Sequence, residues 1–156
     1  MKKCVFLSAM LVAFAQVAVA ETTVTSVDNC VIQEVLPGKA MTGAFVTFHH
    51  QGPAVDIIAA EIPSITSHVE LHSMELKDHV MTMIPLTNPS LEAGIREFKK
   101  GADHVMLMSI PEEKLPRVGE IHTMTFKFSN GTEASCDAMV KSIDEIMQAA
   151  GIKMAH

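Results

Sequence analysis

Residues 120–142, EIHTMTFKFSNGTEASCDAMVKS, contain two segments of alternating apolar and polar residues on either side of an Asn130-Gly131 pair. Alternation with a period of two is typical of a β-strand that buries one face. An Asn-Gly pair favours the tight turn of a β-hairpin. This stretch therefore predicts two antiparallel strands joined at Asn130-Gly131.

Similar short apolar segments recur upstream, separated by Pro, Gly and Asn residues that favour turns. We expect seven further strands, within residues 24–35, 43–50, 54–62, 68–76, 79–86, 94–98 and 103–110. Many short strands at this spacing, without a long helical period among them, indicate an antiparallel all-β sandwich or barrel.

The C-terminal segment is the only part with helical character. Ser142 can cap a helix that Gly151 can end, and residues 152–156 are expected to be loose. We therefore expect one β-sandwich domain over residues 21–141, followed by a short helix and tail over residues 142–156.

The first twenty residues are typical of a secretory signal peptide. Two lysines precede a long apolar run that ends at Ala18-Val19-Ala20, a cleavage pattern of small residues. The run is short for a membrane-spanning helix, so we expect cleavage after Ala20 and no membrane insertion afterwards. Cys4 lies too near the start to be the lipid-bearing cysteine of a lipoprotein, and we expect its removal with the leader.

The negative net charge of the chain argues against nucleic acid and anionic membranes as partners. The chain has a net charge of −6, and residues 1–20 hold two lysines and no acidic residue. The remaining chain therefore has 10 basic and 18 acidic residues, a net charge of −8. Such a chain repels nucleic acid and anionic lipid surfaces. A cation or a basic partner is easier to accommodate.

Two cysteines, Cys30 and Cys136, remain after the expected cleavage. An exported chain meets an oxidising compartment, where this pair can form a disulfide that closes a large loop. Two buried free thiols are the alternative, and the sequence leaves both open. The spacing of the cysteines does not resemble a metal-binding motif.

The most unusual pattern is His-x-Met, which occurs at residues 72–74, 79–81, 104–106 and 122–124. Side chains two residues apart in a strand point to the same face, so the His and Met of each pair are aligned. Residues 70–84 are expected to form a hairpin. If the strand at 103–110 lies beside this hairpin, two imidazoles and two or three thioethers converge at one end of the sandwich. The residues favoured as ligands are His72, Met83, His104 and Met106.

These four side chains predict a Cu(I) site. Thioether sulfur is soft and neutral, so it binds Cu(I) well and Mg²⁺, Ca²⁺ or Mn²⁺ poorly. A site of two His and two Met carries no negative charge, and it therefore favours the monovalent ion. It also lacks the cysteine thiolate of a blue-copper centre. Such a site suits copper that is held for transfer.

Packing offers a competing interpretation of each residue. A methionine at alternate strand positions more often fills a core than binds a metal, and a single histidine beside a strand is usually hydrogen-bonded at the surface. We assign Met108 and Met124 to the core on this ground. Four His-x-Met pairs in one short chain are harder to explain by packing alone.

Two segments resemble the signature of the periplasmic copper chaperones of the PCuAC type: VELHSMELKDHVMTMIPL (69–86) and GADHVMLMSI (101–110). In that family a His is followed ten residues later by a Met and about twenty residues further by His-x-Met. Here ten residues separate His72 from Met83, and twenty separate Met83 from His104. The segments at 36–52 and 120–131 are similar to a Pro-Gly loop with its strand and to a late strand of the family.

The resemblance implies a cupredoxin-like Greek-key β-sandwich that binds one Cu(I) through His72, Met83, His104 and Met106. It also implies a periplasmic location and delivery of copper to a protein such as cytochrome oxidase or an Sco-type protein. Met74 matches a family methionine considered a spare ligand.

Two other functions compete with this one. The first is a secreted β-sandwich interaction module with a Met-rich face and no metal. The second is an enzyme, which we do not expect because the sequence has no CxxC pair and no open set of three histidines. Met147, Met154 and His156 are similar to the tails of some family members and offer a second copper site, although a frayed end is the favoured interpretation.

Overall fold

A computed structural model describes residues 22–152 of the chain. The predicted signal peptide lies outside this range, as do Met154 and His156 of the tail. The elements are β1 (Val24–Gln33), β2 (Thr42–Gln51), β3 (Val55–Glu61), β4 (His68–Lys77), β5 (Val80–Pro85), β6 (Ser90–Leu91), β7 (Gly94–Phe98), β8 (His104–Met108), the 3₁₀ helix η1 (Glu112–Lys114), β9 (Ile121–Phe128), β10 (Glu133–Lys141) and α1 (Ile143–Ala149).

All nine segments predicted as strands contain strands, and only the two-residue strand β6 and the 3₁₀ helix η1 were not expected. The hairpin at Asn130-Gly131 is confirmed, since β9 pairs with β10 in antiparallel register. Gly131 has a φ of 83° in this turn, a backbone conformation that glycine adopts without steric cost. Its amide donates a 2.9 Å hydrogen bond to the carbonyl of Phe128.

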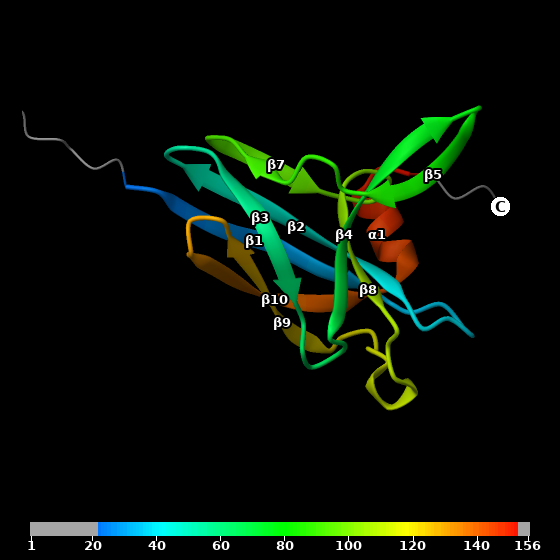
Figure 1. Cartoon of the computed structure of the whole chain (residues 1–156). Coiled ribbons are helices and arrows are strands. Elements are labelled where there is room, and N and C mark those ends of the chain that lie inside the picture. Colours follow the sequence, from blue (N-terminus) through cyan, green and yellow to red (C-terminus); the bar gives the residue numbers. More distant parts are fainter. Residues whose placement is uncertain (1–21, 153–156) are drawn as a thin grey trace, which may run out of the picture.

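The strands form one continuous hydrogen-bonded sheet in the order β5-β4-β8-β2-β1-β10-β9-β3-β6, with β7 also paired to β2. The sheet folds over on itself, so that β3 and β4, distant in this order, come back into contact. Figure 1 shows the hairpin of β4 and β5 projecting from the body of the sheet. The expectation of an antiparallel sheet was wrong for one pair, because β1 runs parallel to β10.

The core lies between the two folded halves of the sheet. Phe48 of β2 contacts Phe98 and Phe126 edge to face, with ring centroids 5.1 Å and 4.9 Å apart. Along β9, Met124, Phe126 and Phe128 are buried at alternate positions, as the sequence pattern predicts. Each fully buried side chain of this size stabilises the fold by about 1.5–3 kcal/mol.

The C-terminal helix α1 begins where the sequence predicts. The Ser142 hydroxyl accepts a hydrogen bond from the Glu145 amide, and the Glu145 carboxylate accepts one from the Ser142 amide. This capping box satisfies amides that the first turn leaves free. In the described part of the chain, no helix is long and apolar enough to cross a membrane.

Cys30 of β1 and Cys136 of β10 form a disulfide, which settles the alternative that the sequence left open. The bond links two neighbouring strands across 106 residues of sequence. Cys30 is buried, and Cys136 packs against the same hydrophobic core. The covalent link therefore holds the first and last strands of the domain together.

We predict that the Cys30→Ala, Cys136→Ala double variant loses about 2–5 kcal/mol in free energy of unfolding, because a native disulfide restricts the unfolded chain. Urea denaturation measures the loss. The unreduced, denatured protein without residues 1–20 should show no thiol that reacts with Ellman's reagent, whereas two reactive thiols would contradict the bond.

Candidate metal centre

Three strands at one end of the sheet carry the predicted ligands. Strand β4 pairs with β5 on one side and with β8 on the other. In this register His72 of β4 lies directly opposite His104 of β8, and their ring centroids are 6.0 Å apart. The strand at 103–110 therefore lies beside the hairpin, which is the condition for these side chains to converge.

The register of the β4–β5 hairpin sets the position of Met83 relative to His72. The direct partner of Met83 across the hairpin is Met74, whereas His72 lies opposite Pro85. Met83 is thus a diagonal neighbour of His72, two positions along β5. Diagonal neighbours on the same face of a sheet remain within reach of long side chains.

The side chains of β8 alternate between two faces: one face packs into the hydrophobic core, and the other belongs to the candidate site. Val105 and Leu107 are fully buried and belong to the hydrophobic core. His104 and Met106 point to the opposite face and are also nearly buried, at 6% and 8% exposure, without belonging to the core cluster. Met106 is therefore buried on the face of β8 that lies away from the main core cluster. Met108, expected in the core, is only half-buried, so that prediction was wrong.

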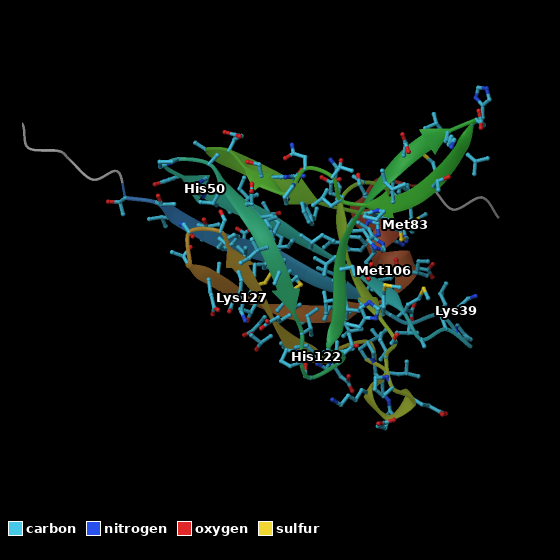
Figure 2. The ribbon with its side chains drawn as sticks, viewed as in Figure 1. Lys39, His50, Met83, Met106, His122 and Lys127 are labelled. Atoms are coloured by element: carbon cyan, nitrogen blue, oxygen red, sulfur yellow. A yellow bond between two sulfur atoms is a disulfide. The ribbon has the colours of Figure 1, made fainter. Side chains whose placement is uncertain are left out.

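The outer face of β8 forms the floor of a pocket of about 400 Å³, which we call the methionine pocket. Figure 2 shows Met83 and Met106 close together on this side of the molecule. Gly43 of β2 pairs with Met106 and forms part of the floor, next to the rings of Phe45 and His104. The thioether and imidazole side chains that line the pocket are Met41, Met74, Met83, Met106 and His104.

The His104 ring is oriented by the backbone. Its Nδ1 lies 2.8 Å from the carbonyl oxygen of Ala102, which can only accept a hydrogen bond. Nδ1 therefore carries the proton, and Nε2 keeps its lone pair for a metal. Burial is the largest cause of the lowered pKa of His104, and the nearby charges of His72 and Lys100 lower it further, whereas the Ala102 carbonyl and Asp103 raise it. The ring therefore favours the neutral form that binds metals.

In the His72 ring the other nitrogen, Nε2, makes the hydrogen bond. Nε2 lies 2.8 Å from the Glu70 carboxylate and donates to it, so in the neutral form of the ring Nδ1 is the nitrogen with the lone pair. Nδ1 is buried and has no hydrogen-bond partner in the structure. The pKa of Glu70 is lowered because its carboxylate accepts hydrogen bonds from His68 and His72. A carboxylate that orients one nitrogen of a metal-binding imidazole is a common second layer of a metal site.

Three of the four predicted ligands, Met83, His104 and Met106, line the methionine pocket together. His72 stands beside them in contact with His104, but it is not part of the pocket wall. Sequence reasoning missed Met41, which enters the pocket from the loop before β2. No strand pattern marks that residue, so its position depends on tertiary structure alone.

A hydrogen-bond network behind the site fixes β4 against β8. Asp103 precedes His104, and Ser73 follows His72 on the neighbouring strand. The Ser73 hydroxyl donates to Asp103 over 2.6 Å, and Arg96 of β7 donates to the other carboxylate oxygen over 2.8 Å. Arg96 also donates to the carbonyls of Asn88 and Ser90. The network therefore holds both histidine backbones in register.

The donor set is soft and uncharged. None of the described residues that line the methionine pocket carries a carboxylate. Across residues 22–152, moreover, no three His, Cys, Asp or Glu side chains gather as metal ligands do. The arrangement therefore fits a soft monovalent ion better than Zn²⁺, Mg²⁺ or Ca²⁺.

Comparison with known families identifies the chain as a member of the LpqE-like family, described as "Putative lipoprotein LpqE-like", which it matches over residues 25–140. No curated protein matches the chain.

The fold is that of the PCuAC domains. The apo PCuAC domain from PmoF1 is 16% identical, with a TM-score of 0.59 over 74% of this chain and 92% of that domain. The copper-bound PCuAC domain from PmoF2 is 19% identical, with a TM-score of 0.56 over 74% and 91%. The Cu(I) form of DR1885 from Deinococcus radiodurans is 23% identical, with a TM-score of 0.53 over 81% of each chain. These likenesses confirm the expected cupredoxin-like sandwich.

We predict that Asp103→Asn lowers the free energy of unfolding by about 1 kcal/mol at neutral pH, because the partly exposed carboxylate loses its charge-assisted hydrogen bonds. Burial alone would raise the pKa of Asp103, but hydrogen bonds from Ser73 and Arg96 lower it below the usual 3.8.

The stabilisation by Asp103 is therefore present above about pH 4 and lost as the pH falls through the lowered pKa. Urea denaturation of wild type and variant at several pH values should show their difference shrinking in acid. A difference that stays constant down to pH 2 would contradict this role of Asp103.

Proposed function

We propose that the chain is an exported copper carrier, which binds one Cu(I) through His72, Met83, His104 and Met106 and delivers it to a partner protein. The observation that carries the proposal is the methionine pocket. It gathers three of these side chains without any carboxylate, and the fourth, His72, has a buried nitrogen without a hydrogen-bond partner.

The chemistry of the donors supports Cu(I) as the ion. Two imidazole lone pairs and two thioethers form a neutral set, which does not compensate the charge of a divalent ion. The copper-bound domain from PmoF2 and the Cu(I) form of DR1885 have the same fold and add support.

The unequal exposure of the proposed ligands supports transfer of copper to a partner protein. His104 and Met106 are nearly buried on β8, whereas Met83 is 44% exposed on the projecting hairpin. An incoming ligand can reach the Met83 side of the ion first, because that side faces solvent. Stepwise displacement from Met83 inward releases copper without unfolding the site.

The location and partner of the carrier rest on the sequence. The predicted signal peptide and the lipoprotein family support export, and the resemblance to PCuAC chaperones supports the periplasm. The same resemblance favours cytochrome oxidase or an Sco-type protein as the copper acceptor. We assign no catalytic role to the site.

The competing function is a secreted interaction module with a Met-rich face. Leu76, Val80 and Met81 are indeed exposed on the same hairpin as Met83. A module without metal predicts that Cu(I) leaves thermal stability unchanged. A carrier predicts stabilisation of about 2.7 kcal/mol at a free Cu(I) concentration of 100 times Kd.

We predict that Met83→Ala weakens Cu(I) binding at least about tenfold, because one of four ligands is lost. Titration against a Cu(I)-specific chelator measures the affinity. Met139→Ala is the matched control: Met139 is 43% exposed, close to the 44% of Met83, and lies on β10 outside the pocket.

X-ray absorption of the loaded wild type should count two sulfur and two nitrogen neighbours. A His104→Ala, Met106→Ala variant that still binds one Cu(I) as tightly would eliminate the assignment.

We also predict that Glu70→Gln weakens Cu(I) binding about tenfold or more, since the carboxylate no longer fixes the His72 ring. His68→Gln is the control, because His68 donates to the same carboxylate from an exposed position but is not a proposed ligand. Equal losses in both variants would assign Glu70 a general structural role instead.

A further inference from the structure

Two lysines line the methionine pocket beside the proposed ligands. Lys39 lies in the loop between β1 and β2, and Lys100 lies in the loop between β7 and β8. Figure 2 shows Lys39 on the same side of the molecule as Met106. We call this pair the lysine rim.

The lysine rim is not neutralised by nearby carboxylates. Within residues 22–152, neither lysine forms an ion pair, whereas Lys127 pairs with Glu61. Lys39 is exposed, and the Lys100 ammonium donates a 2.8 Å hydrogen bond to the uncharged side chain of Gln33.

The two carboxylates adjoining the site have other partners. Glu70 accepts hydrogen bonds from His68 and His72, and it does not line the pocket. Asp103 is held by Ser73 and Arg96. The pocket itself therefore has a positive charge in a chain whose net charge is −6.

A positive rim does not help the pocket hold copper. Like charges repel, so two ammonium groups oppose the binding of a cation by neutral ligands. The same charges attract an anion that approaches the pocket, and they offset the repulsion that an acidic chain exerts on it at longer range. The rim therefore suits the exchange of copper with an anionic molecule better than its storage.

We propose that Lys39 and Lys100 guide negatively charged copper ligands into the methionine pocket, and that the exchange partner is a protein whose copper ligands are thiolates or lie among carboxylates. The inference rests on the proposed function. In the exchange a bond from Cu(I) to an incoming donor forms while the bond to the Met83 sulfur breaks. Copper stays monovalent, and no electron or proton is transferred.

Two Cu(I) chelators with the same dimethylphenanthroline core but different charge test the proposal. Bathocuproine disulfonate carries sulfonates, and neocuproine is uncharged. The rate at which each removes Cu(I) from the loaded protein is followed by the absorbance of the chelate, for wild type and for Lys39→Gln, Lys100→Gln. Lys99→Gln is the control, since Lys99 adjoins Lys100 in sequence but does not line the pocket.

We expect the double variant to slow extraction by bathocuproine disulfonate about threefold to tenfold at low salt, while extraction by neocuproine changes less than about twofold. Salt at about 0.5 M should remove the difference between wild type and variant, because it screens the charges. The Lys99 variant should behave as wild type.

Equal changes with both chelators, or no change with either, would overturn the role of the lysine rim. The neocuproine measurement also reports on the integrity of the site, since a damaged pocket releases copper faster to both chelators. A wild-type chain that retains no Cu(I) at all would instead remove the proposed function, and the inference with it.

Discussion

The candidate site depends on the antiparallel pairing of β4 with β8. This pairing places His72 opposite His104 and brings Met106 onto the same face as Met74 and Met83. A slip of one residue in either strand would turn its ligands to the other face, because side chains alternate. Backbone hydrogen bonds alone do not fix a register, and the Asp103 network adds a side-chain contact next to both histidines.

Much of the fold follows from local patterns. Alternation and turn residues located nine strands, and Asn130-Gly131 located the last hairpin. The parallel contact of β1 with β10 was not predictable, because it joins strands about a hundred residues apart and leaves no mark in either segment. The two-residue strand β6 is too short to show a period.

For the candidate site, the sequence indicated which residues could act as ligands better than it indicated how they are arranged. Strand parity aligned His104 with Met106, and the spacing of His72 and Met83 matched a family pattern. The sequence did not give the register that makes Met74 the partner of Met83. It also could not reveal which nitrogen of each imidazole is free, since Ala102 and Glu70 decide this through contacts made only in the folded chain. Met41 joins the pocket from a loop, where periodicity carries no information.

The Cys30–Cys136 bond couples the maturation of this domain to the compartment in which it folds. Inside a reducing cytosol the two thiols stay separate, and the first and last strands are held by non-covalent contacts alone. A chain in that state is less stable, because it lacks the covalent link between these two strands. For the exported chain that we propose, oxidation after translocation would then form the bond, so the fully stabilised domain would arise only outside the cytosol.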